Sequence, residues 1–167
     1  MGDTQWLDQR QLQAWVSLRA VLELLPGVLD AQLREDDDLT EFEYYTQAAL
    51  SGAPDRMLRM SELAKRTNAT LARLSHVVTR LGARGLVERV PDPDDGRVTK
   101  VRLTEQGLDK VRRAAPGHVA TVRRYVIDTL SAEQVDQLAE IGAAILAELD
   151  PSGTLTATYT RDDRASE

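Results

Sequence analysis

The sequence predicts a mainly α-helical protein that carries one small β-hairpin. Most apolar residues recur every three to four positions, which is the spacing of a helix face, and aromatic residues make up only 4% of the chain. Two segments, 86–90 and 99–103, instead alternate apolar with charged residues, and turn-forming residues separate them. At 167 residues the chain can form one domain with a core, or two small lobes that share a long helix.

The first expected helix begins near Gln11. Apolar residues at helical spacing continue from there to Leu25, and charged residues lie between them on other faces. Pro26 is expected to disturb this helix, because proline removes one backbone donor. The acidic segment 34–40 is expected to form a connector to the next element.

A second helix is expected over 41–50. Thr40 and Glu43 have the spacing of a capping box, in which each side chain accepts a hydrogen bond from the other residue's backbone N–H. Leu39 and Tyr44 can add an apolar contact across this helix start.

Two shorter helices joined by a tight turn come next. A helix near 61–66 is followed by a break at 67–70, and a longer helix runs from Leu71 to about Arg84, where Gly85 closes it. These helices form a helix-turn-helix candidate, and the hairpin follows them directly. This order of elements predicts a winged-helix lobe.

Two more helices and a polar tail complete the chain. Thr104 is expected to cap the first of them, and Pro116 is expected to kink or interrupt it. Ser131 and Gln134 form a second capping box, which opens a last helix that Pro151 ends.

The middle of the chain is basic although the whole chain is acidic. The formal net charge is -6, yet residues 56–102 contain eleven Lys or Arg against five Asp or Glu. On the expected helix 71–84, one face should pack inward through Leu71, Leu74, Val78 and Leu81. Another face carries Arg73, His76, Arg80 and Arg84, with Thr70, Ser75 and Thr79 around them.

These basic and hydroxyl side chains suit the major groove of DNA. Arginine can give two parallel hydrogen bonds to guanine, and Ser or Thr can meet bases or phosphates. A basic helix face is more often merely solvated. The preceding short helix, the tight turn and the charged hairpin together favour nucleic-acid binding over that interpretation.

At these residues the chain resembles the MarR family of bacterial winged-helix transcription regulators. The matching segments are "MSELAKRT", "LSHVVTRLGARGLVER" and "DPDDGRVTKVRLTEQG", which resemble the first helix of the reading motif, the recognition helix with the first wing strand, and the wing. The third is the most specific, because it carries Asp95, Arg97, Leu103, Thr104 and Gly107 at the family spacing. The close resemblance covers residues 57–107.

The resemblance implies a sequence-specific DNA-binding regulator, usually a repressor, that binds an inverted repeat as a homodimer. It divides the chain into a dimerisation helix with its connector (1–38), a winged helix-turn-helix lobe (39–107), C-terminal dimerisation helices (108–150) and a polar tail (151–167). The implied DNA contacts are Thr70, Arg73, Ser75, His76, Thr79, Arg80, Arg97 and Lys100, and Asp95 is expected to orient Arg97 by a salt bridge.

The chain departs from the family pattern at two places on this helix. Leu71 and Ala72 stand where many relatives have polar or basic residues, so base recognition is expected to be sparser or to use the thymine methyl group. Gly82 replaces a commoner helix former, at a cost of up to about 1 kcal/mol relative to alanine.

The resemblance also implies a small aromatic or anionic effector that binds between the dimerisation helices and the lobe. The residues expected along that crevice are Trp15, Arg19, Phe42, Tyr44 and Tyr45. Each has a plainer interpretation, since aromatic residues at helical spacing often belong to the core and Arg19 can form a surface ion pair. The chain has two histidines and no cysteine, so no metal, cofactor or thiol switch is expected.

The sequence also bears on other functional classes. No glycine-rich phosphate loop or serine-hydrolase elbow is present in the sequence, so the chain is not expected to be an enzyme. The polar N-terminus and the expected lack of a membrane span favour the cytoplasm. The remaining alternative is a winged-helix protein-interaction module without specific DNA binding, because overall acidity opposes non-specific DNA affinity.

Overall fold

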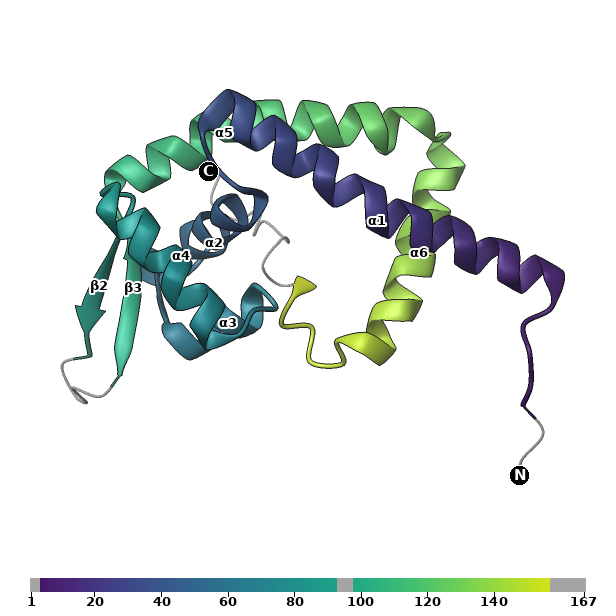
Figure 1. Cartoon of the computed structure of the whole chain (residues 1–167), viewed down its shortest axis with the longest axis horizontal. Coiled ribbons are helices and arrows are strands. Elements are labelled where there is room, and N and C mark those ends of the chain that lie inside the picture. Colours follow the sequence, from purple (N-terminus) through teal and green to yellow (C-terminus); the bar gives the residue numbers. More distant parts are fainter. Residues whose placement is uncertain (1–3, 93–97, 157–167) are drawn as a thin grey trace.

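The computed structural model describes residues 4–92 and 98–156. Within them, six α-helices and one antiparallel sheet form a winged helix-turn-helix lobe and a helical arm (Figure 1). The helices are α1 (Gln9–Asp37), α2 (Glu41–Ser51), α3 (Met60–Arg66), α4 (Leu71–Ala83), α5 (Glu105–Tyr125) and α6 (Ala132–Leu149). The strands are β1 (Met57–Arg59), β2 (Val87–Pro91) and β3 (Thr99–Leu103). The lobe consists of α2, α3, α4 and the sheet, and the arm consists of α1 and α6. The predicted fold class is confirmed.

Helix α1 is longer than the sequence predicts. It continues through Pro26 without interruption and ends only at Asp37, so the expectation of a connector over 34–40 is wrong for its first four residues. Leu29 and Leu33, which follow the proline, are buried, and α1 contacts α2 and α5. This packing stabilises the second half of the helix and compensates for the hydrogen bond that proline removes.

Helix α1 also meets the length and hydropathy criterion for a membrane span, although the sequence was expected to contain no such segment. An 18-residue window within it has a mean hydropathy of 1.3, and 6% of that window is buried inside the chain. This criterion alone is weak evidence, because a helix whose apolar face packs against a second chain also meets it.

Helix α2 begins as predicted. The Thr40 hydroxyl accepts a hydrogen bond from the Glu43 N–H at 3.1 Å, and the Glu43 carboxylate accepts one from the Thr40 N–H at 2.9 Å. Leu39 and Tyr44 are both buried at this end. The helix lies in the centre of the molecule, where it contacts α1, α3, α5 and the sheet.

Helix α4 buries one side in the core of the lobe. Leu74, Val78 and Leu81 are buried as predicted, together with Val77. The expectation that Leu71 packs inward is wrong, because its side chain, on the first residue of the helix, is 55% exposed. After α4, Gly85 takes a φ of 70°, a left-handed conformation that glycine adopts without steric cost, and the chain turns into β2.

The sheet contains one strand more than predicted. The expected hairpin is formed by β2 and β3, and β1 pairs with the other edge of β3, so the strand order is β1-β3-β2. Leu58 lies opposite Val101, and Val87 lies opposite Leu103. These four side chains are buried and join the sheet to the helical core.

Helix α5 begins at its predicted cap and links the lobe to the arm. It runs through Pro116 to Tyr125, so an interruption at Pro116 is not observed. Ala114 and His118 on either side of the proline are buried, and α5 contacts both α1 and α2. Tertiary packing therefore keeps this segment helical despite the proline.

Helix α6 begins at the predicted capping box of Ser131 and ends before Pro151. None of its described residues is buried. Apolar side chains are exposed along α6 and along the first half of α1, which reaches away from the lobe (Figure 1). They are Leu12, Trp15, Val16, Leu18, Val21, Leu22 and Leu24 of α1, and Leu138, Ile141, Ile145 and Leu149 of α6.

His118 is a buried polar residue where α5 meets α2. The Tyr45 hydroxyl lies 3.3 Å from His118 Nε2, and the Tyr44 ring centroid lies 4.8 Å from that of the imidazole. The buried Nδ1 atom has no hydrogen-bond partner among the described residues. Burial lowers the pKa of His118 below its ordinary value, because the charged imidazolium is poorly solvated there.

Gly107 should not tolerate a side chain. A Cβ atom at this position would overlap the Leu86 carbonyl oxygen and would lie 2.7 Å from Leu103 Cδ1. We expect Gly107→Ala to lower the free energy of unfolding by about 1 to 3 kcal/mol, as overpacking does elsewhere. Gly82→Ala is the matched control, since its Cβ would lie 3.7 Å from the nearest atom, and it should change stability by less than about 1 kcal/mol. Urea unfolding of both variants tests this, and equal losses would contradict it.

His118 should make stability depend on pH. Because its pKa is lower in the folded chain, its contribution to stability is complete above the unfolded pKa near 6.5 and decreases as the pH falls through that value. As the pH falls from 7.5 to 5, the free energy of unfolding of wild type should therefore decrease relative to that of His118→Gln. Urea unfolding at a fixed protein concentration measures it. A difference that stays constant between pH 7.5 and pH 5 would contradict this prediction.

Candidate nucleic-acid interface

Two arginines of α4 and Arg84, which follows the helix, have partners at the start of α2 or just before it. The Arg73 guanidinium carbon lies 4.1 Å from the Phe42 ring centroid. Arg80 forms an ion pair with Glu43 at 3.0 Å, and Arg84 forms one with Asp38 at 3.3 Å. The predicted basic face therefore borders the start of α2.

The other side of α4 contacts the wing through Arg89 of β2. Its Nη2 donates to the Ser75 carbonyl at 3.2 Å, to Ser75 Oγ at 3.0 Å and to Thr79 Oγ1 at 3.3 Å. Sequence reasoning missed this residue. The signal was available, because Arg89 shares a strand face with the buried Val87, two residues earlier, and that face turns toward the helices.

Several predicted contact residues also stabilise the lobe. The Thr70 hydroxyl caps α4 by accepting from the Arg73 N–H at 3.2 Å. Lys100 forms an ion pair with the buried Asp92 at 3.1 Å. His76 is exposed on α4. The predicted residues thus lie along α4 on two sides, with Arg73 and Arg80 toward α2 and Ser75 and Thr79 toward the wing. Lys100 lies on β3 of the wing, whereas Asp95 and Arg97 lie outside the described residues.

Most positive charges of the basic segment are paired with carboxylates. Among the described residues of 56–102, the ion-paired cations are Arg56, Arg59, Arg66, Arg80, Arg84, Lys100 and Arg102. In the same part of the chain, three exposed cations have no carboxylate partner, and they are Lys65, Arg73 and Arg89. Arg73 lies on α4, and Arg89 of β2 contacts this helix at Ser75 and Thr79. Positive charge without a carboxylate partner is therefore concentrated at α4.

The corner between α1 and α2 is fixed by Asp30. Its carboxylate accepts from the Glu41 N–H at 2.8 Å and from Arg34 Nε at 2.5 Å. Burial alone would raise the pKa of Asp30, but these hydrogen bonds and the Arg34 charge outweigh it and lower that pKa. Burial and the neighbouring Asp30 charge raise the pKa of Glu41. The ionised Asp30 thus holds the start of α2 against α1.

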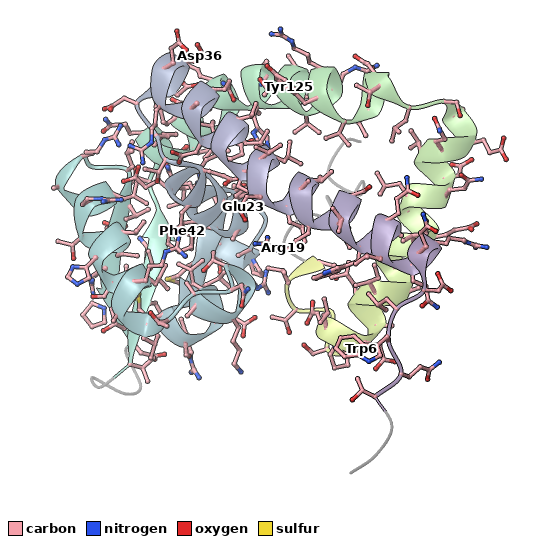
Figure 2. The ribbon with its side chains drawn as sticks, turned by 45° about the vertical axis from the view of Figure 1, so that its right-hand side comes forward. Trp6, Arg19, Glu23, Asp36, Phe42 and Tyr125 are labelled. Carbon is pink, nitrogen blue, oxygen red and sulfur yellow. The ribbon has the colours of Figure 1, made fainter. Side chains whose placement is uncertain are left out.

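The five residues expected along an effector crevice do not form one cluster. Tyr44 and Tyr45 lie together, with ring centroids 5.6 Å apart, beside His118. Arg19 forms the surface ion pair that was its plainer interpretation, with Glu23 one turn along α1 at 2.8 Å (Figure 2). Trp15 is half-exposed on the same helix, and Phe42 contacts Arg73 instead. In the described part of the chain, no group of three or more His, Asp or Glu side chains could hold a metal ion.

Comparisons with known proteins agree with this architecture. The MarR family model matches residues 43–98. The crystal structure of Sco3205, a MarR family transcriptional regulator from Streptomyces coelicolor in complex with DNA, is 39% identical, with 90% of this chain and 94% of that chain covered and a TM-score of 0.84.

Two curated repressors are also similar to this chain. The transcriptional repressor IacR of Pseudomonas putida is 43% identical over 54 residues, which are 32% of each protein. The transcriptional repressor YetL of Bacillus subtilis is 26% identical over 81% of this chain and 80% of its own length. The identity to Sco3205 extends over nearly the whole of both chains, so this chain belongs to the MarR family of transcriptional regulators.

Proposed function

We propose that this chain is a sequence-specific DNA-binding regulator of transcription that acts as a repressor at an inverted-repeat operator. The observation that carries the proposal is positive charge at α4: among the described residues, Arg73 on this helix and Arg89 of β2, which contacts it, have no carboxylate partner, in a chain of net charge -6. The likeness to a DNA-bound regulator and to two repressors supports it. We further propose that the protein has no catalytic activity and that it acts in the cytoplasm.

In this proposal α4 enters the major groove. Its exposed residues Arg73, His76 and Thr79 and the half-buried Ser75 contact bases or phosphates, and the helix start at Thr70 offers backbone N–H groups to a phosphate. Arg97 and Lys100 of the wing contact the neighbouring backbone, and Asp95 orients Arg97. To these residues we add Arg89, because it lies between the wing and α4, and Leu71, whose exposed side chain suits a thymine methyl group.

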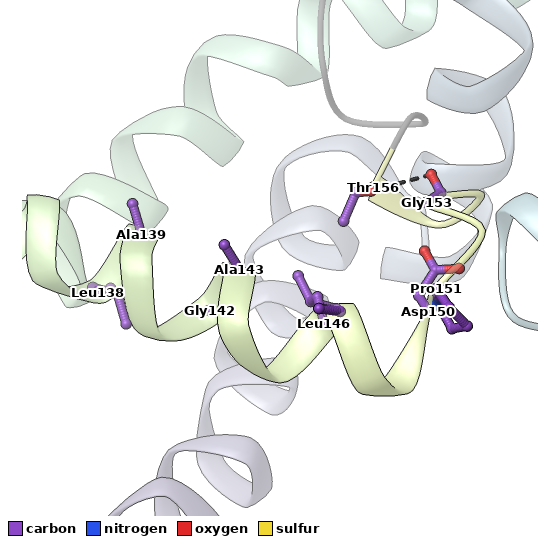
Figure 3. A pocket seen from close by; sticks show the side chains of 10 residues that line it. Leu138, Ala139, Gly142, Ala143, Leu146, Asp150, Pro151, Gly153 and Thr156 are labelled. Carbon is purple, nitrogen blue, oxygen red and sulfur yellow. Dashed lines mark hydrogen bonds between the residues drawn. The ribbon is translucent and has the colours of Figure 1, made fainter.

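The proposed active form is a homodimer. Helix α6 and the first half of α1 expose apolar side chains that the chain cannot bury alone, and such patches mark interfaces. An apolar groove of about 690 Å³ also follows α6, lined by Leu138, Leu146, Pro151 and small residues between them (Figure 3). Residues 1–38 and 108–150 thus supply dimerisation, while 39–107 read DNA.

We further propose that a small aromatic or anionic effector releases the DNA. Tyr44, Tyr45 and His118 lie where the arm meets the lobe, and His118 Nδ1 has no hydrogen-bond partner in the described part of the chain. Trp15 and Arg19 lie further along α1. Burying a polar atom without a hydrogen-bond partner costs free energy, so a ligand that supplied the missing partner would gain affinity.

The alternative is a winged-helix module that binds another protein. The net charge of -6 favours it, because an acidic surface repels DNA. The salt dependence of binding separates the two functions, since release of counterions from DNA gives a steep slope and a protein partner need not show one.

Selection from a pool of random duplexes tests the proposed function. Wild type should recover an inverted repeat whose half-sites are centred about 10 bp apart, and contacts to six phosphates should give a slope of log K against log salt of about -5. Arg73→Ala and Arg97→Ala should each weaken binding about five- to 150-fold. Arg113→Ala, which removes the same charge from an exposed site on α5, is the control. No enrichment and no salt dependence would favour the protein-interaction alternative.

A charge on α6 should prevent dimer formation. Ile141 is 58% exposed in the single chain, and Ile141→Glu would place a carboxylate in the proposed interface. We expect this variant to sediment as a monomer at micromolar concentration and to lose most operator affinity. Glu140→Gln, on an exposed neighbour, should stay dimeric. A wild type that sediments as a monomer would contradict the dimer.

A further inference from the structure

Glu43 is a buried carboxylate whose two oxygens bind different elements. Its side chain is 6% exposed. Oε2 accepts hydrogen bonds from the Thr40 N–H at 2.9 Å and from Thr40 Oγ1 at 3.1 Å, which completes the cap of α2. Oε1 accepts a hydrogen bond from Arg80 Nε at 3.2 Å and forms an ion pair with Arg80 Nη2 at 3.0 Å. One side chain therefore joins the start of α2 to α4.

This contact differs from the other ion pair that α4 forms with the same corner. Asp38, the partner of Arg84, is 96% exposed, and an exposed pair contributes little to stability. Glu43 is removed from water, so losing its cationic partner would leave a buried charge uncompensated. Arg80 is thus held by the stronger constraint.

Arg80 keeps a free edge while it is held. Both contacts to Glu43 use Nε and Nη2, and Nη1 has no hydrogen-bond partner among the described residues. The Arg80 side chain is 59% exposed. On the opposite side of α4, Arg89 contacts Ser75 and Thr79. The helix is therefore fixed from both sides, by a carboxylate of α2 and by an arginine of the wing.

We propose that Glu43 is a positioning residue for DNA recognition, which acts by fixing the rotation of α4 and by orienting the Arg80 guanidinium so that its free edge faces DNA. The inference rests on the proposed function. An Arg80 guanidinium that is already oriented before binding loses less entropy when DNA binds. The resulting gain in affinity applies only where the contact geometry is specific. Glu43 should therefore favour the operator over unrelated DNA.

Glu43→Gln tests the proposal without removing the cap. Glutamine at the third helical position also completes a capping box, so the variant loses the negative charge that pairs with Arg80 and retains the start of α2. We expect operator affinity to fall at least tenfold and affinity for an unrelated duplex to stay within twofold. Asp38→Asn is the matched control, since it removes one negative charge from the same corner and asparagine tolerates the φ of 50° there. It should leave both affinities within twofold of wild type.

A double-mutant cycle with Arg80→Gln shows whether the effect passes through Arg80. In the Arg80→Gln background, Glu43→Gln should change operator affinity less than twofold. Additive losses of binding free energy in the two variants would overturn the proposal. Equal losses of affinity for operator and for unrelated DNA would also overturn it, because they indicate a smaller folded fraction. Tighter binding by Glu43→Gln, with a salt slope steeper by about one, would show that Glu43 merely neutralises Arg80.

The same titrations separate this inference from the proposed function. Wild type that binds no sequence preferentially would overturn the proposed function and the inference together. Wild type that binds its operator, with a Glu43→Gln variant that binds equally well, would overturn the inference alone. Thermal unfolding of each variant, monitored by circular dichroism, establishes that the titrated protein is folded.

Discussion

The placement of α4 depends on hydrophobic contacts along one side of that helix. Leu74, Val78 and Leu81 are almost fully buried, and burial of each such side chain contributes about 1.5 to 3 kcal/mol. Because these residues recur at helical spacing, the residues on the opposite side of the helix must point outward. The exposed polar face is therefore a geometric consequence of the core, and any substitution that repacks the core would also rotate the arginines.

Ion pairs then determine which of these arginines keep an unneutralised charge. The sequence shows an excess of positive charge over 56–102, but most of that charge is matched by carboxylates in the fold. Some of these partners, such as Glu43, lie outside the segment itself. Arg73 and Arg89 keep no carboxylate partner within the described residues, and both are at α4. The local field at the candidate interface is thus set by a few residues and not by the segment's total charge.

Local signals predicted the fold well, and contacts distant in sequence account for most of what they missed. The caps at Thr40 and Ser131 depend on residues three positions away, so the sequence alone was sufficient. Strand β1 has three residues and exists only because β3 pairs with it. Pro26 was expected to disturb its helix, but packing of the following turns keeps α1 continuous. The bond from Glu43 to Arg80 spans 37 residues, and no local pattern indicates it.

The acidity of the chain makes orientation more important than total charge. A molecule of net charge -6 gains little from long-range attraction to DNA, and a dimer would carry twice that charge. At physiological salt the screening length is about 8 Å, so only cations close to the phosphates contribute appreciably. Few such cations are free, and each must therefore meet its partner in the correct geometry. A buried carboxylate that fixes one arginine of α4 can then increase specificity even though it lowers the local positive charge.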